Sequence, residues 1–170
     1  MPSRRLFLAA AVAFAIVPAA VRAAPADTPA AFVTAVFAPV TAGDGTSGGS
    51  AITDRETRAR WFTGAVVKLW NAADAKAEKD GDIGPVDFDL LTASQDPRVG
   101  RVAIEPRETR PDAATVRVDL FATKKARPGA KPYSSLELVL KRENGGWRID
   151  DVKEVSGAYT WTLRGLLMAR

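Results

Sequence analysis

Proton-transfer chemistry in this 170-residue chain would have to come from carboxylates, lysines or tyrosines, because the sequence contains neither histidine nor cysteine. The missing imidazole excludes a Ser-His-Asp triad and a histidine base. The missing thiol excludes disulfides, cysteine nucleophiles and zinc sites built from cysteine and histidine. What remains is a pairing of Tyr133 or Tyr159 with a carboxyl group such as Asp96 or Asp151. Burial would have to raise the pKa of that carboxyl group before it could transfer a proton.

Five residues are candidates for contacts with a ligand, and each has a plain structural alternative. Tyr133 stands at the start of a predicted strand, where an exposed ring is an ordinary outcome. Asp96 precedes a proline, a position where carboxylates commonly close turns onto backbone amides. The candidate ligand-binding residues are Trp70, Gln95, Asp96, Tyr133 and Asp151.

Asp151 carries the most specific structural expectation of the five. Strand alternation places it on the same face as Trp147 and Ile149, so its side chain is predicted to point inward unless a bulge intervenes. A buried carboxylate needs a partner, so Asp151 would either pair with an arginine such as Arg60 or line a cavity. Trp70 is likewise either a core residue or a surface on which a ligand could stack.

Two glycine-containing tracts resemble ligand motifs but fail on their context. Gly43–Gly48 has the letters of the dinucleotide fingerprint, yet a predicted helix precedes it and Asp44 would repel a pyrophosphate. Asp80–Gly84 suggests a calcium loop, but its glycine is misplaced and Leu91 occupies the position of the final glutamate. We therefore predict no metal site and no cofactor, and we assign no catalytic residue.

The net charge of +4 is mostly a property of the N-terminus. Arg4, Arg5 and Arg22 lie among the first 23 residues, which contain no acid, so the remainder holds 21 basic and 20 acidic residues. Acidic and basic residues are interleaved along that remainder, which argues against binding to nucleic acid. The basic stretch Lys124–Lys131 is interpreted as a solvated hairpin tip.

Residues 1–23 have the pattern of a secretory signal peptide. A short basic start is followed by 12 apolar residues, Leu6–Val17, and by a small-residue end, with cleavage predicted after Ala23. Residues 3–8 also resemble the twin-arginine export signal, although a general secretory signal that carries two arginines fits equally. Both routes predict a periplasmic or secreted protein. The apolar run is shorter than the roughly 20 residues of a permanent span, so no membrane span is predicted after cleavage.

A single domain is predicted over residues 24–170, with helices before strands. The capping box Thr53–Glu56 marks the start of a long helix, and Gly81 follows its end. The last helical segment could instead be an edge element of a sheet. The predicted helical segments are 29–40, 53–79, 88–96 and 159–168.

From residue 101 the hydrophobic period changes from helical to alternating, which predicts antiparallel strands with one apolar face. A long hairpin loop is predicted over 124–132, and a tight turn at Asn144–Gly146. The fold class is therefore α+β, with N-terminal helices packed on an antiparallel sheet. The predicted strands are 101–105, 116–122, 136–141 and 147–152.

Two stretches, 88–96 and 138–152, together resemble a family of exported bacterial proteins known only as a domain of unknown function. The second stretch contains the strand Gly-Gly-Trp-Arg-Ile-Asp-Asp-Val, and the likeness covers Phe32 to Leu167. The order of elements is similar to that of the nuclear transport factor two-like, or cystatin-like, cone. This resemblance implies a curved antiparallel sheet that curls around the long helix and leaves a conical cavity, but it implies no reaction.

Two functions are therefore weighed. The first is an exported, non-catalytic domain that binds a small molecule or an envelope protein at the cone mouth or sheet face, with a homodimer through the sheet as a further interaction. The second is a small-molecule isomerase, dehydratase or hydrolase that uses a tyrosine–carboxylate pair in the cone. A hollow, polar cone would favour catalysis. Binding on the outside would be favoured by a cone filled with Phe32, Phe37, Leu69 and Trp70.

Overall fold

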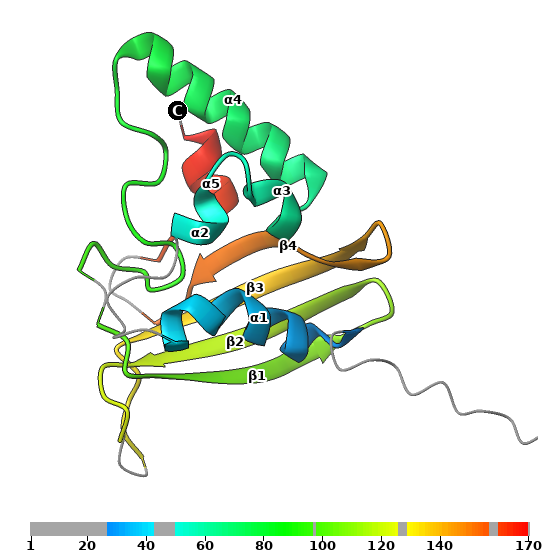
Figure 1. The fold of residues 1–170 in the computed structure, drawn as a ribbon, viewed down its shortest axis with the longest axis vertical. Coiled ribbons are helices and arrows are strands. Elements are labelled where there is room, and N and C mark those ends of the chain that lie inside the picture. The colour runs from blue at the N-terminus through cyan, green and yellow to red at the C-terminus, as the bar shows by residue number, and fades with distance from the viewer. Residues whose placement is uncertain (1–26, 43–49, 97, 126–128, 157–159, 170) are drawn as a thin grey trace, which may run out of the picture.

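The computed structural model describes residues 27–42, 50–96, 98–125, 129–156 and 160–169 (Figure 1). Helices precede a four-stranded antiparallel sheet, which confirms the α+β class. The predicted leader, the tract Gly43–Gly48 and Tyr159 lie outside the described residues. The elements are α1 (Pro29–Ala42), α2 (Ser50–Thr53), α3 (Arg58–Trp61), α4 (Gly64–Asp80), β1 (Arg101–Thr109), β2 (Ala113–Phe121), β3 (Ser134–Glu143), β4 (Gly146–Glu154) and α5 (Leu163–Met168).

The sheet is a meander in which each strand pairs with the next, in the order β1-β2-β3-β4. Alternation puts Val116 opposite Leu138 and Val118 opposite Leu136, and all four side chains are fully buried. The turn between β3 and β4 uses Asn144 and Gly145 at φ values of 52° and 77°. Positive φ at both central residues matches the right-handed twist of a two-residue hairpin, so the predicted tight turn is confirmed.

Helix α1 lies across one face of the sheet, over β1 and β2 (Figure 1). We call this the inner face. The buried side chains of α1 meet the apolar inner face in one continuous core that also contains Leu90 and Leu91. No helix in the described part of the chain is both long and apolar enough to cross a membrane. The α1 residues in this core are Val33, Val36, Phe37 and Val40.

The predicted long helix is broken, and the expectation that it starts at Thr53 is wrong. Thr53 ends α2, and its carbonyl oxygen accepts hydrogen bonds from Nε and Nη2 of Arg58 at 3.2 and 2.8 Å. The chain is extended at Phe62, and the amide of Thr63 donates to the carbonyl of Ile149 on β4 at 2.9 Å. The Thr63 side chain then caps α4, which ends at left-handed Gly81 as predicted.

Helix α4 packs against α5 and beside β4, and it does not cross the inner face of the sheet (Figure 1). The sheet therefore faces α1, and the expectation that it curls around the long helix is wrong. Residues 88–96 form hydrogen-bonded turns in place of the predicted helical turns. The carboxylate of Asp89 accepts from the amides of Leu91 and Thr92 at 3.0 Å each, which satisfies amides that a helix would otherwise use.

The two edges of the sheet are protected in different ways. On β1, the register shifts between Pro106 and Glu108, and the strand carries charged side chains along this exposed part. On β4, the edge is covered by the chain itself, because Phe62 bridges Ile149 and Thr162 bridges Lys153.

Candidate functional site

The candidate Trp70 is part of the core. Its side chain is 3% exposed, and its ring meets the Phe62 ring edge-on with centroids 5.4 Å apart. The guanidinium of Arg58 lies 4.6 Å from the Trp70 ring centroid, and it also donates to Asp74 at 2.8 Å. Arg58 is itself only 4% exposed. Trp70 and Arg58 therefore tie α3 to α4, and Trp70 offers no free ring face to a ligand.

The candidates Gln95 and Asp96 lie on an exposed turn before β1. The amide of Asp96 donates to the Ser94 hydroxyl at 3.0 Å. Gln95 contributes to the lining of an open depression of about 520 Å³ together with residues 86–89. Asp96 thus lies on a turn before Pro97, whereas Gln95 was expected in a helical turn, and of the two it is Gln95 that borders this hollow.

The candidate Asp151 does not point inward, because a bulge intervenes. Val139 pairs with Asp151 while Leu140 pairs with Ile149, so Asp150 has no partner in the register. Asp151 therefore lies on the face opposite to Ile149, where its Oδ1 accepts from the amide of Arg164 at 3.1 Å. The expected pairing with Arg60 is wrong, since the Arg60 guanidinium lies over the ring of Trp61.

The neighbouring Asp150, which was not among the candidates, is the more connected carboxylate. It is 7% exposed and accepts from Thr63 Oγ1 at 3.0 Å, from Lys141 Nζ at 2.9 Å and from Arg164 Nη2 at 2.6 Å. Burial acts to raise its pKa, but the hydrogen bonds from Lys141, Arg164 and Thr63 outweigh burial, so the pKa of Asp150 lies below its ordinary value of 3.8. Asp150 thereby joins β4, the start of α4 and α5.

The candidate Tyr133 lies near carboxylates other than those expected. Its hydroxyl donates to the Thr92 carbonyl at 3.4 Å. Burial and the charges of Asp89 and Glu154 raise the pKa of Tyr133 to about 12. A phenol with that pKa is protonated at neutral pH and can donate a hydrogen bond but cannot accept a proton as a base. Asp96 and Asp151 play no part in this shift.

Glu154 is a buried carboxylate near Tyr133, so it is the acid that the enzyme hypothesis would pair with that tyrosine. Both of its oxygens already accept hydrogen bonds. It is 6% exposed. Oε2 accepts from the Ser134 hydroxyl at 2.6 Å, and Oε1 accepts from the Ser156 hydroxyl at 2.9 Å and amide at 3.2 Å. These hydrogen bonds join β4 to Ser134 on β3 and to Ser156 just beyond β4.

Side chains from α1 and α4 fill the core beside the sheet. Phe37 on α1 and Trp70 on α4 are buried in it, and Phe32 and Leu69 pack against it partly buried. From the sequence, a core filled by these four side chains was expected to favour ligand binding on the outer surface of the domain. Ligand contacts are thus expected at the surface, where the structure has several open hollows.

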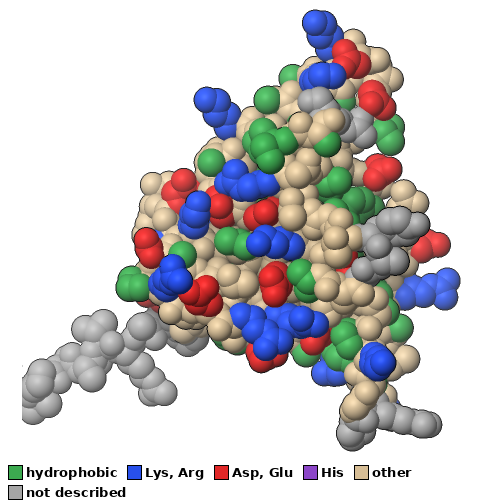
Figure 2. All heavy atoms as spheres, turned by 180° about the vertical axis from the view of Figure 1, so that it is seen from behind, with side chains coloured by type: hydrophobic (Ala, Val, Ile, Leu, Met, Phe, Trp, Pro, Cys, Tyr) green, Lys and Arg blue, Asp and Glu red, His purple; other side chains and the backbone are tan. Residues whose placement is uncertain are grey.

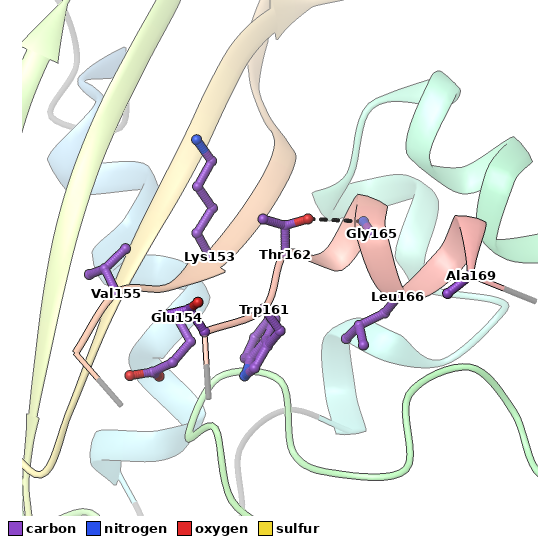
Figure 3. A pocket seen from close by; sticks show the side chains of 9 residues that line it. Lys153, Glu154, Val155, Trp161, Thr162, Gly165, Leu166 and Ala169 are labelled. Atoms are coloured by element: carbon purple, nitrogen blue, oxygen red, sulfur yellow. Dashed lines mark hydrogen bonds between the residues drawn. The ribbon is translucent and has the colours of Figure 1, made fainter. Parts of the chain in front are cut away.

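The largest of these hollows that we describe is a groove of about 740 Å³ between the end of β4 and α5, which we call the β4–α5 groove (Figure 3). The Thr162 hydroxyl accepts from the Gly165 amide at 2.9 Å and starts α5, which sets one wall. The Trp161 ring is held edge-on by Phe88, with centroids 5.0 Å apart. The groove is lined by Lys153, Glu154, Val155, Thr160, Trp161, Thr162, Gly165, Leu166 and Ala169.

Sequence reasoning missed this groove because its shape depends on how α5 is set against the end of β4, although its described lining residues all fall between 153 and 169. The terminal segment was expected to be a closing helix or an edge element, and both descriptions apply in part: Thr162 bridges Lys153 at the sheet edge and then begins α5. The available signal was Thr162, a favourable N-cap residue directly before an apolar stretch. Nothing in the sequence showed that the start of α5 would be fixed to the bulge at Asp150.

The described residues contain no group of three or more histidine, cysteine, aspartate or glutamate side chains placed to hold a metal ion. Comparisons with protein-family models, with curated proteins and with solved structures found no match to this chain.

Proposed function

We propose that this chain is an exported, non-catalytic binding domain whose ligand occupies the β4–α5 groove. The observation that carries the proposal is the contrast between a sheet face filled by α1 and an open groove of about 740 Å³ outside it. This volume lies within the range of pockets that hold one small molecule. An apolar lining with a few polar groups at its border is also typical of such pockets.

The proposal includes the nuclear transport factor two-like architecture and the exported domain-of-unknown-function family. In support, a helix crosses one face of a four-stranded antiparallel meander, and the strand that begins at Gly146 carries the quoted motif. The position of α4 beside β4 distinguishes this chain from the simple cone, in which the long helix fills the sheet.

Export is proposed from the N-terminal pattern of residues 1–23 and predicts a periplasmic or secreted mature protein. Cell fractionation and intact-mass measurement should give a chain that begins at Ala24. Replacing Arg4 and Arg5 by lysine should block export if the twin-arginine route is used, and should leave it unchanged if the general route is used. A protein that keeps its first 23 residues in the cytoplasm would overturn this part of the proposal.

A binding role is favoured over the tyrosine–carboxylate enzyme by the pKa of Tyr133 and by the hydrogen bonds that Tyr133 and Glu154 already make. Tyr133 has a pKa of about 12 and donates to a backbone carbonyl, and both oxygens of Glu154 accept hydrogen bonds from serines. General acid–base catalysis works best with groups whose pKa lies near the working pH. Tyr133, with its pKa of about 12, does not meet this condition, and the oxygens of Glu154 already accept hydrogen bonds within the protein.

Blocking the groove tests the proposal directly. Ala169 is exposed and lines the groove, so Ala169→Trp should fill it, whereas Ala72 is exposed on α4 and Ala72→Trp should serve as the matched control. The purified proteins are screened by ligand-detected NMR against a panel of small apolar, anionic and cationic compounds. Compounds that bind wild type and Ala72→Trp but not Ala169→Trp support the proposal. A panel in which every binder also binds Ala169→Trp, or in which nothing binds, overturns it.

A further inference from the structure

We propose that the occupant of the β4–α5 groove is a free anionic amphiphile, a single small molecule with an apolar body in the groove and an acidic head at Lys153. This inference rests on the proposed function, because it names the chemical class of ligand for the same groove.

The apolar body is inferred from the lining. Val155, Trp161, Leu166 and Ala169 give the groove aliphatic and aromatic surface, and two of the nine lining residues that the structure describes carry a charge. Trp161 is already held in place by Phe88, so little side-chain freedom is lost when a ligand packs against it. Removing such surface from water is the main source of affinity for an apolar ligand.

The acidic head is inferred from Lys153, one of the two charged lining residues. Its side chain is half-buried, and it forms no ion pair with any residue that the structure describes. Glu137 stands opposite Lys153 in the register of β3 and β4, yet the two do not form an ion pair. An ammonium beside apolar surface, without an acidic partner, is complementary to a carboxylate or a similar anion on the ligand.

Glu154, the other charged residue of the lining, does not favour a cationic ligand. Ser134 and Ser156 donate to its two oxygens at 2.6 and 2.9 Å, and the carboxylate is 6% exposed. Figure 3 shows the side chains of Lys153 and Glu154 leaving β4 in opposite directions. Among the described lining residues, the charge that remains available to a ligand is therefore that of Lys153.

A free molecule fits the surroundings better than a membrane surface. An anionic bilayer would require a broad basic surface beside the groove. Figure 2, which shows the face opposite α1, has acidic and basic side chains intermixed across it. Ion pairs such as that between Arg117 and Asp119 at 2.9 Å balance charges on the sheet. The groove itself has room for one molecule of moderate size.

Three ten-carbon probes separate the contributions of the body and the head: decanoate, decanol and decyltrimethylammonium, each below its micelle concentration. Isothermal titration calorimetry is run on the wild-type protein, on Lys153→Gln and on Lys79→Gln, a control that removes an exposed lysine at the end of α4. Decanoate should bind wild type about fivefold more tightly than decanol, and Lys153→Gln should abolish this difference, because a partly exposed charge pair contributes about that factor. Added salt should reduce the difference in wild type.

The outcomes distinguish this inference from the proposed function on which it rests. Equal affinity for decanoate in wild type and Lys153→Gln, tighter binding of the cation, or no binding of any probe overturns the inference. The proposed function still stands in those cases if the wider panel finds a ligand that Ala169→Trp excludes. Flotation with anionic phosphatidylglycerol vesicles that exceeds binding of free decanoate, and that depends on Lys153, also overturns the inference in favour of a membrane surface.

Discussion

Replacing Asp150 by alanine should destabilise the protein by about 3 kcal/mol at neutral pH. The estimate assigns about 1 kcal/mol to the hydrogen bond from Thr63, which is 3% exposed, and about 1.5 kcal/mol to the pairing with Arg164. The pairing with Lys141 adds under 1 kcal/mol, because the lysine side chain is 55% exposed. The loss also leaves the buried Thr63 hydroxyl without its acceptor.

The sign of the pH dependence follows from the lowered pKa of Asp150. Because the folded-state pKa lies below the unfolded value of 3.8, this group stabilises the fold fully above about pH 5. The contribution is lost as the pH falls through the folded-state pKa. Urea denaturation of wild type and Asp150→Ala at pH 7, 5 and 3 should therefore show a difference in unfolding free energy that is constant between pH 7 and 5 and smaller at pH 3.

Two further variants sharpen this test. Asp150→Asn keeps the size of the side chain and removes the charge, so it should lose most of the same free energy. Asp80→Asn removes an exposed carboxylate paired with Lys76 and should change stability by under about 0.5 kcal/mol. A loss below about 1 kcal/mol for Asp150→Ala, or a loss of equal size at pH 7 and pH 3, would refute the reasoning.

Three other predictions follow from single contacts. Arg58→Met should cost about 3 kcal/mol in chemical denaturation, because it leaves the shielded carboxylate of Asp74 without its closest cation. Gly100→Ala should cost about 3 kcal/mol or prevent folding, since the added Cβ would overlap the carbonyl carbon of Thr123. Ultraviolet absorbance titration should show a tyrosine that ionises near pH 12, and Tyr133→Phe should remove that transition.

Matched controls make these results decisive. Arg55→Met removes a guanidinium that is 54% exposed, and Gly84→Ala adds a Cβ whose nearest neighbour is 3.9 Å away, so each should change stability by under about 0.5 kcal/mol. If Arg58→Met or Gly100→Ala behaves like its control, the corresponding contact does not hold the fold. A titration curve in which Tyr133→Phe removes a transition near pH 10 would contradict the raised pKa that partial desolvation and the charges of Asp89 and Glu154 give this phenol.

The parts of the fold that depend on local chemistry were predictable from the sequence. The strands follow from alternation, the β3–β4 turn from Asn144 and Gly145, and the end of α4 from Gly81, because each signal acts within a few residues. The interruption of the long helix was not predictable in this way. It depends on Arg58 reaching back to Thr53 and on Thr63 joining the edge of β4, and these contacts exist only after the chain has folded.

The positions of Asp150 and Asp151 also depend on a feature that the sequence does not reveal, the bulge in β4. One unpaired residue in β4 moves Asp151 to the opposite face and brings Asp150 into contact with Thr63 and Arg164. A one-residue change of register reverses every inward and outward assignment after it. Asp150 and Asp151 are both buried, at 7% and 9% exposed, and the sequence did not show that a bulge would place Asp151 on the face opposite to Ile149 and leave Asp150 in contact with Thr63 and Arg164.

The protected edges of the sheet have a consequence for how the protein behaves at high concentration. Strand-by-strand growth into cross-β fibrils requires a flat, unpaired edge strand. The edge at β1 is irregular and charged, and the edge at β4 is covered by other segments of the chain, so neither edge can accept a new strand readily. Self-association that used the sheet would have to proceed through its broad faces. The native protein should therefore resist seeding by amyloid-like aggregates, as long as the segment around Thr162 remains docked.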